Sequence, residues 1–462
     1  MLRTLVGPDA YARALDLYFD RHDGEACTIE DWLKVFEDTT GRDLSQFKRW
    51  YSQAGTPRLS VREEWEDGVY TLSFTQTLPP SATTPDPQPQ VLPIAVCLLS
   101  PNGDEVHATD VLEMTQATQS FRFEGLAARP VPSILRGFSA PVVLEHDTDH
   151  AFLLAHDTDP FNRWEAARTL AKSSLLATIR EGAAPSPAYL DGIRSVLRDD
   201  TLDPATRALM LGLPGQSELA TALHQDGVTP DPDAIYAATE SMRDAMAAHL
   251  REGLLPVFEA NQVSAPYQPN AEQSGQRSLA NTMLSLITRI EGPDRARAQF
   301  DQADNMTQQL AALANLIRAG AGEDALRAFE AQWKLDRLVM DKWFALQIVE
   351  ANPQDAASIA ARLTEHPDFK WKNPNRFRST LGAMAMHHAG FHAMDGAGYR
   401  LLTDWLIKLD PVNPQTTARM CSAFQTWKRY DADRQTLIKA HLERIMAKNN
   451  LSRDTSEMVS RI

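Results

Sequence analysis

Residues 58–75, RLSVREEWEDGVYTLSFT, mark a change in the hydrophobic pattern of this chain. Apolar and polar residues alternate on both sides of Glu66-Asp67-Gly68, and this two-residue period around an Asp-Gly pair predicts a β-hairpin. Four further strand patterns follow, separated by turn residues: 91–99, 120–123, 133–138 and 141–144. Short strands at intervals of about ten residues indicate a small β-sandwich, which we place at residues 58–146.

The segment before the sandwich, residues 1–57, has the 3.6-residue period of helices. The stretch Thr28-Ile29-Glu30-Asp31 has capping residues at its first and fourth positions, which predicts a helix N-terminus with a capping box. Phe36, Phe47 and Trp50 lie at helical spacing farther along. Three short helices bury little apolar surface by themselves, so this segment is expected to belong to a larger domain.

From about residue 159 to the end, almost every segment has helical periodicity. The clearest candidates are 164–176, 187–197, 204–210, 233–252, 278–290, 306–318, 323–333, 356–363, 398–408, 416–427 and 433–447. Successive helix pairs over so long a stretch favour a solenoid of HEAT- or ARM-like hairpins, with an irregular helical bundle as the alternative. The fold class expected is therefore multidomain α+β: helices, a small β-sandwich, then a large all-α superhelix.

Composition narrows the functional classes. The 462 residues are 43% hydrophobic and 23% charged, which is typical of globular domains, and the net charge is -15. That charge argues against a nucleic-acid partner or a polybasic membrane patch. No run of about 18 uncharged apolar residues predicts a membrane helix, and the first residues do not resemble a signal peptide. The three cysteines, Cys27, Cys97 and Cys421, form no CxxC, which favours a reducing, cytoplasmic location.

Two histidine groups are the places to look for a metal site. The stretch 146–150, HDTDH, has its histidines four residues apart, but its residues favour a strand-to-helix loop in which the side chains do not converge. In the second group, only His388 and His392 share a helical face, and Asp395 is the one acid nearby; we interpret these, with His387, as surface or helix-end residues. Because no HExxH, GxSxG, Walker A or GxGxxG pattern occurs either, the residues alone predict no catalytic site and no metal.

Several phrases rich in aromatic and charged residues occur in a definite order along the chain. They are MLRTLVG (1–7), LYFDRHDG (17–24), WYSQAGTP (50–57), DPFNRWEAA (159–167), ADNMT (303–307), VMDKWF (339–344), NPNR (373–376) and KRYDA (428–432). Together they resemble the C-terminal half of the bacterial aminopeptidase N (alanyl aminopeptidase) family, which are gluzincin metallopeptidases. The resemblance covers essentially the whole chain.

The resemblance implies a division into three parts. Residues 1–57 match the helical tail of a thermolysin-like catalytic domain, 58–146 the β-sandwich and 147–462 the C-terminal superhelix. The family's GAMEN, HExxH and transition-state Tyr residues all lie upstream of the segment that matches Met1. Met1 is thus expected to be internal to a longer protein, whether through a split gene, an internal start or a partial reading frame. Phe36, Phe47 and Trp50 are then expected to lack the domain against which they pack.

The resemblance also implies a function for the complete protein, which is zinc-dependent removal of N-terminal residues from peptides. This chain alone is expected to be inactive and to hold no zinc, with the missing N-terminal catalytic half as its partner and peptides as substrates. By position, Arg378 and Arg419 are the candidate substrate-channel arginines. The alternative is a free-standing helical-repeat module that binds a peptide or protein.

Overall fold

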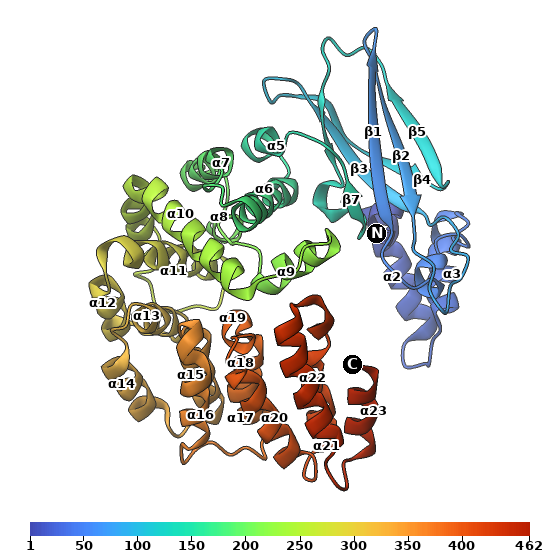
Figure 1. Cartoon of the computed structure of the whole chain (residues 1–462). Coiled ribbons are helices and arrows are strands. Elements are labelled where there is room, and N and C mark those ends of the chain that lie inside the picture. Colours follow the sequence, from blue (N-terminus) through green and yellow to red (C-terminus); the bar gives the residue numbers. More distant parts are fainter. The chain divides into compact units, whose positions relative to one another are not determined.

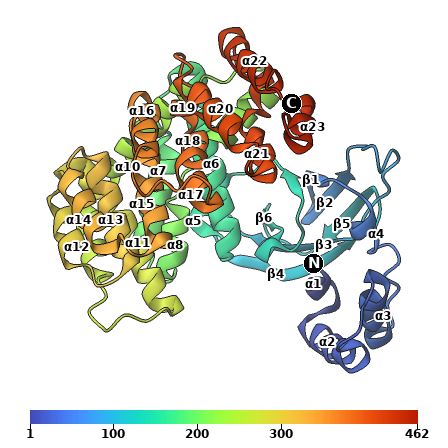
Figure 2. The same ribbon diagram turned by 90° about the horizontal axis from the view of Figure 1, so that it is seen from below.

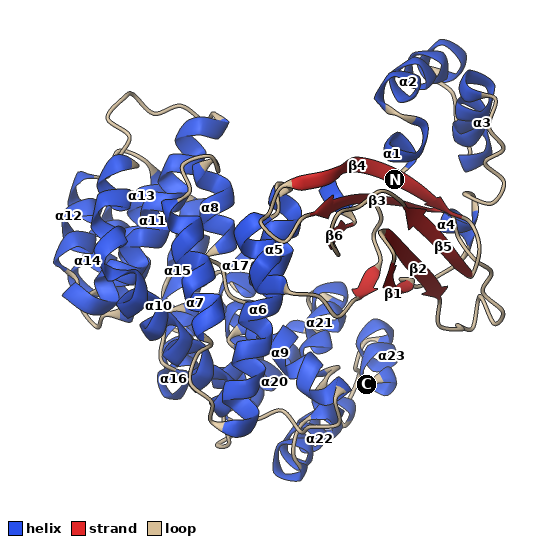
Figure 3. Cartoon of the chain, turned by 90° about the horizontal axis from the view of Figure 1, so that it is seen from above, coloured by secondary structure: helices blue, strands red, loops and turns tan.

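The computed structural model describes all 462 residues, and the chain divides into two compact units, Met1–Thr169 and Leu170–Ile462 (Figure 1). All strands lie in the first unit, whereas the second is helical throughout (Figure 3). No helix combines the length and the apolar composition that crossing a membrane requires.

The first unit begins with four helices. They are α1 (Leu2–Val6), α2 (Pro8–His22), α3 (Ile29–Thr40) and α4 (Arg49–Ser52). The predicted capping box is confirmed at α3: the Asp31 amide donates to Thr28 Oγ1 at 3.3 Å, and the Thr28 amide donates to Asp31 Oδ2 at 2.9 Å. Helices α2 and α3 pack side by side (Figure 2).

The three aromatic residues that were expected to lack a packing surface are in contact with neighbours instead. Phe36 and Phe47 are buried in a small core that also contains Leu33 and Val91. The Trp50 indole donates a hydrogen bond to the Val91 carbonyl oxygen at 2.8 Å. The expectation was wrong because Phe36 packs against Tyr11 and Trp32 of the same helices, and the chain segment just before β3 contacts Trp50.

We nevertheless expect residues 1–57 to be the least stable part of the folded chain. Helix α2 fully buries only Ala14, and Phe19 is 59% exposed, so little apolar area holds this segment in place. Hydrogen exchange under native conditions should show faster amide exchange here than in the helical unit. Equal protection of the two regions would contradict this prediction.

Seven strands form two sheets in the first unit. They are β1 (Arg58–Glu66), β2 (Val69–Thr77), β3 (Leu92–Leu99), β4 (Glu105–Met114), β5 (Thr118–Phe123), β6 (Val131–Ile134) and β7 (Val143–Glu145). One sheet has the order β5-β2-β1-β7 and the other β4-β3-β6. The predicted hairpin is confirmed, with β1 and β2 antiparallel and Glu66 opposite Val69. Alternate residues of β2, namely Tyr70, Leu72 and Phe74, enter the core of the sandwich.

Two details of the sandwich differ from the expectation. Strand β4 was not predicted, because only Leu112 and Met114 of its ten residues are buried and no alternating apolar pattern signals it. The end of the predicted strand at 133–138 is instead a 3-10 turn, Arg136–Phe138. Leu135 and Phe138 have φ values of 62° and 55°, which a continuing strand does not allow.

Helix α5 (His150–His156) follows the sandwich, and α6 (Pro160–Glu181) crosses into the second unit. The remaining α-helices are α7 (Pro187–Arg198), α8 (Pro204–Met210), α9 (Gln216–Gln225), α10 (Pro232–Ala260), α11 (Ala271–Glu291), α12 (Asp294–Gln302), α13 (Met306–Arg318), α14 (Glu323–Trp333), α15 (Arg337–Val349), α16 (Pro353–Thr364), α17 (Pro374–Phe377), α18 (Ala383–Met386), α19 (His388–Phe391), α20 (Ala397–Leu409), α21 (Pro414–Cys421), α22 (Ala432–Met446) and α23 (Arg453–Arg461). Shorter turns are the π-helix η2 (Arg378–Gly382) and the 3-10 helices η3 (Ser422–Phe424) and η4 (Trp427–Arg429).

The helical unit is a curved array with one continuous core. Helices from α10 to α22 follow one another in chain order around an arc (Figure 1). One cluster of buried residues runs through the unit from Ala171 to Val459. The chain also returns on itself, because α19 packs against α10 and Arg429 reaches Thr221, 208 residues earlier. The solenoid expectation is thus confirmed over the irregular bundle, and the curvature brings distant segments together around an inner surface.

Candidate functional site

Both arginines singled out from the sequence lie exposed on the helical unit. Arg378 begins the π-helix η2, and its guanidinium donates to the Pro374 carbonyl at 3.2 Å and to Asn375 Oδ1 at 2.8 Å. Arg419 is near the end of α21, and its guanidinium has no hydrogen-bond or ion-pair partner. Neither side chain is paired with a carboxylate, so both guanidinium groups are free to bind one.

Gly382 shows that these two arginines lie on neighbouring segments. A Cβ atom added at Gly382 would lie 3.4 Å from Cβ of Arg378 and 3.8 Å from Cε of Met420, the residue after Arg419. Arg378 and Gly382 are the two ends of the π-helix, a local irregularity often found at functional sites. The structure therefore brings the two predicted arginines into one region of the surface.

A larger hollow lies elsewhere in the helical unit. Its volume is about 720 Å³, and neither Arg378 nor Arg419 lines it. It is bounded by α9, α10, the ends of α13 and α15, the α18–α19 corner and the η3–η4 segment. Its charged lining residues are Arg243, Arg318, Arg429, Glu240 and Glu350. We call this hollow the inner cavity.

Histidines 387, 388 and 392 lie beside the inner cavity at the ends of α19, so the helix-end alternative holds, whereas the surface alternative is wrong for two of them. His387 is the N-cap of α19, and its Nδ1 accepts from the Gly390 amide at 3.1 Å. His388 and His392 bound the same helix but are buried, 9% and 5% exposed, with ring centroids 5.3 Å apart. Burial, together with the nearby Arg429 and Arg434 charges, lowers the pKa of His388 to about 4, so its imidazole is neutral at pH 7.

Arg429 belongs to one of the phrases that carry the family resemblance, but its local sequence does not mark it as a site residue. Arg429 stands in the KRYDA phrase, is 9% exposed and lines the inner cavity. A buried arginine is uncommon, but no local pattern reveals that the η4 segment will be covered by α9. Arg429 is the functional candidate that the sequence analysis missed.

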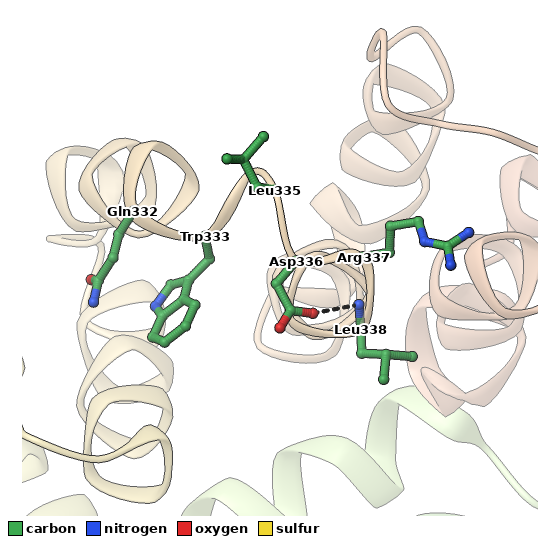
Figure 4. Close-up of a pocket in the computed structure, with 6 residues that line it drawn as sticks. All are labelled: Gln332, Trp333, Leu335, Asp336, Arg337 and Leu338. Atoms are coloured by element: carbon green, nitrogen blue, oxygen red, sulfur yellow. Dashed lines mark hydrogen bonds between the residues drawn. The ribbon is translucent and has the colours of Figure 1, made fainter.

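A second, smaller hollow of about 470 Å³ lies at the turn between α14 and α15 (Figure 4). Leu335 and Leu338 are 92% and 68% exposed there. Asp336, a polar residue of the turn, caps α15: its Oδ1 accepts from the Leu338 amide at 2.9 Å. Because this carboxylate already has its partners, the hollow offers no set of convergent polar groups for a ligand.

The other histidine pair lies in the β-sandwich. Residues 146–149 form a loop between β7 and α5, as predicted, with Asp149 as the N-cap and His150 as the first residue of the helix. His146 Nε2 lies 2.7 Å from Glu63 Oε1, and Arg129 donates to Glu63 Oε2 at 3.0 Å. Burial raises the pKa of Glu63, but hydrogen bonds from His146 and Arg129 outweigh it and hold that pKa at about 2.

The lowered pKa of Glu63 predicts a pH-dependent contribution to stability. Its ordinary pKa is 4.5, so the stabilisation is complete above pH 4.5 and is lost as the pH falls toward 2. The variant Glu63→Gln should lower the free energy of unfolding of the first unit by about 3 kcal/mol at pH 7 and by much less at pH 3. Urea unfolding at both values measures this, with Glu64→Gln, an exposed neighbour, as the control. A pH-independent loss would contradict the assignment.

The described residues do not form a zinc site. No group of three or more His, Cys, Asp or Glu side chains is placed to hold a metal ion. His146 is hydrogen-bonded to Glu63, and His392 Nδ1 lies 2.7 Å from the Tyr399 hydroxyl. Since these donor atoms have protein partners and lack further ligands around them, the residues present do not fit a zinc ion.

Comparison with known proteins places the chain in a family. Residues 147–462 match a family model described as a domain of unknown function (DUF3458_C) with ARM repeats. The chain belongs to this family. Residues 55–147 match a second model, a domain of unknown function (DUF3458) with an Ig-like fold. Both descriptions agree with the folds seen here, a small two-sheet sandwich and a large helical array.

Members with curated names are similar over the whole chain. The chain is 38% identical to aminopeptidase N of Caulobacter vibrioides over 476 residues and 35% identical to aminopeptidase N of Escherichia coli K12 over 484 residues. All of this chain is covered, but only 54% and 55% of those relatives, respectively. The chain thus spans about half the length of these relatives and corresponds to their C-terminal part, which confirms the resemblance noted in the sequence.

A solved structure agrees with this assignment. The crystal structure of Legionella pneumophila aminopeptidase A in complex with aspartic acid matches 100% of this chain and 55% of its own chain. The TM-score is 0.85 at 27% sequence identity. The match includes residues 1–57, so the N-terminal helices are also part of the shared architecture.

Proposed function

We propose that this chain forms the non-catalytic C-terminal region of a zinc-dependent aminopeptidase that removes N-terminal residues from peptides. The observation that carries the proposal is the 35–38% identity over the whole chain to proteins named aminopeptidase N. In this proposal the zinc ligands belong to the rest of the enzyme, and this chain supplies a scaffold and a lid over the substrate chamber.

The proposal assigns a role to each segment. Residues 1–57 are the last helices of the catalytic domain, 58–146 the β-sandwich and 147–462 the superhelix that encloses substrate. The family-model bounds, 55–147 and 147–462, support this division. The catalytic half of the enzyme is then the partner of the chain, and peptides are the substrates.

Arg378 and Arg419 are proposed to face the substrate channel and to bind the carboxylate of a peptide. Their exposure, their lack of a carboxylate partner and their neighbouring positions support this role. A guanidinium group binds a carboxylate through two parallel hydrogen bonds, which fixes orientation as well as charge.

A cytoplasmic location is also proposed, and it rests on the cysteines. Cys27, Cys97 and Cys421 are all free thiols, and burial raises the pKa of Cys97 and of Cys421 to about 12. Structural disulfides are common in oxidising compartments, so three unpaired cysteines favour a reducing one.

The alternative, a free-standing helical-repeat module, gives no reason for residues 1–57 to match the relatives. A chimera distinguishes the two. In it, this chain replaces the matching C-terminal part of Caulobacter vibrioides aminopeptidase N. The control is that relative cut short before the matching part. The proposal expects the chimera to hydrolyse alanine p-nitroanilide, whereas a folded but inactive chimera favours the binding module.

A further inference from the structure

The buried arginine of the inner cavity lacks a counter-ion. Arg429 is 9% exposed, and no carboxylate oxygen lies within 4 Å of its guanidinium. It donates to three neutral oxygens: the Tyr430 hydroxyl at 2.6 Å, Thr221 Oγ1 at 3.2 Å and Ser217 Oγ at 3.5 Å. A guanidinium has five N–H donors, and the Nε–H of Arg429 is buried without an acceptor. A charge buried in this way is costly unless something neutralises it.

Arg434, five residues farther along, shows how a buried arginine is usually neutralised, namely by nearby carboxylates. It is also buried, but Asp431 lies 2.7 Å from its Nη1 and Asp233 lies 3.4 Å from its Nη2. Arg277 is the other informative case, since it is buried without a carboxylate too. It stacks on Tyr267, as Arg429 stacks on Tyr430, but it lines no part of the inner cavity. Arg429 therefore combines a missing counter-ion with access to a hollow large enough for a small molecule.

The groups around Arg429 do not supply the missing negative charge. Tyr430 accepts a hydrogen bond from Arg429, and its hydroxyl lies 3.0 Å from Nε2 of the neutral His388. The cavity glutamates are already paired, Glu350 with Arg318, and Glu240 with Arg243 and Arg289. The cavity as a whole thus has one arginine more than it has glutamates, in a chain whose net charge is -15.

We propose that the inner cavity is a binding site for a small carboxylate with an apolar body, anchored by the Arg429 guanidinium. Val349 and Met386 line the same hollow and are 50% and 84% exposed, so they offer apolar contact to the rest of the ligand. Because the other lining arginines are paired with Glu240 and Glu350, Arg429 offers a single unpaired charge, which matches a carboxylate better than a phosphate dianion. The volume of about 720 Å³ is large enough to admit such a ligand. The inference concerns a site separate from Arg378 and Arg419 and does not depend on peptide hydrolysis.

The test is calorimetric titration of the full chain with isovalerate, with isovaleramide as a neutral probe of the same shape and inorganic phosphate as a dianion. Isovalerate should bind, and the other two should bind much more weakly. Acetyl-trialanine and its C-terminal amide form a second pair. If acetyl-trialanine binds and its amide does not, the site also accepts a carboxylate carried by a peptide. If isovalerate binds and neither peptide does, the site takes only small acids. Equal heats from isovalerate and isovaleramide, or none from isovalerate, overturn the proposal without any variant.

Three variants locate the site. Arg429→Gln should weaken isovalerate binding about 10- to 150-fold, the effect of losing one charge-assisted contact. Arg277→Gln removes a buried arginine outside the cavity and should leave binding unchanged. Ser217→Glu places a carboxylate beside Arg429, so it should abolish isovalerate binding and raise the unfolding temperature. This variant keeps the test informative if Arg429→Gln does not fold. Undiminished binding by Ser217→Glu would show that the anion lies elsewhere and contradict the assignment.

Discussion

The isolated 462-residue chain is expected to leave alanine p-nitroanilide uncleaved and to bind no stoichiometric zinc. The reason is the arrangement of its side chains. No three potential ligands converge, and the nearest histidine pair is divided between a Glu63 contact at His146 and the first position of α5 at His150. A zinc site that activates water needs three protein ligands around an open fourth position.

Metal analysis after dialysis against zinc, together with an anilide assay, measures both parts of this expectation. Caulobacter vibrioides aminopeptidase N, assayed under the same conditions, is the positive control. One tightly held zinc per chain that is lost in His146→Ala would overturn the account of this loop. Hydrolysis by the isolated chain at a rate near that of the relative would overturn the proposal that this chain is the non-catalytic part of the enzyme.

Substitution of Arg378 or Arg419 is expected to have a large effect only when the chain is joined to a catalytic half, as in the chimera. With no bound peptide held at a scissile bond, a channel arginine has nothing to orient. In the joined enzyme, Arg378→Ala or Arg419→Ala should raise KM for short peptides about 10- to 150-fold, since one charge-assisted contact contributes about 1.5–3 kcal/mol.

Two controls separate binding from structure. Arg251→Ala removes another exposed arginine of the helical unit and should not change KM. Alanine p-nitroanilide has no C-terminal carboxylate, so its KM should change much less than that of a peptide. If both substrates are affected equally, or if neither changes, then the two arginines do not bind the peptide carboxylate.

Local chemistry explains which parts of the fold could be predicted. The Asp67-Gly68 turn and the Thr28–Asp31 capping box depend on residues within a few positions of one another, and both are present as expected. Helices α8 and α13 begin and end at the predicted residues, because an Asp203 or Asn305 cap precedes each helical pattern. Such signals lie wholly within one element.

The unpredicted elements depend on their neighbours. Strand β4 is at the edge of its sheet and mostly exposed, so its charged residues hide the pattern of a strand. The burial of Phe36 and Phe47 depends in part on Val91, more than forty residues away along the chain. Neither feature can be read from a short window of sequence.

The residues of the candidate site also differ in whether the sequence could reveal them. Arg378 and Arg419 came from the resemblance, not from any local pattern of chemistry. Arg429 was missed because its cavity exists only where η4 meets α9, 208 residues earlier in the chain. The burial of His388 and His392 depends on the same long-range packing, which helical periodicity does not reveal.

The activity of the chimera tests the central claim most directly. The rate of alanine p-nitroanilide hydrolysis is compared for the isolated chain, for the truncated Caulobacter vibrioides relative and for the two joined as one protein. The account predicts that the joined protein is far more active than either part alone and that the isolated chain is inactive. Equal activity of the truncated relative and of the joined, folded protein would show that this chain contributes nothing to catalysis, and would contradict the account.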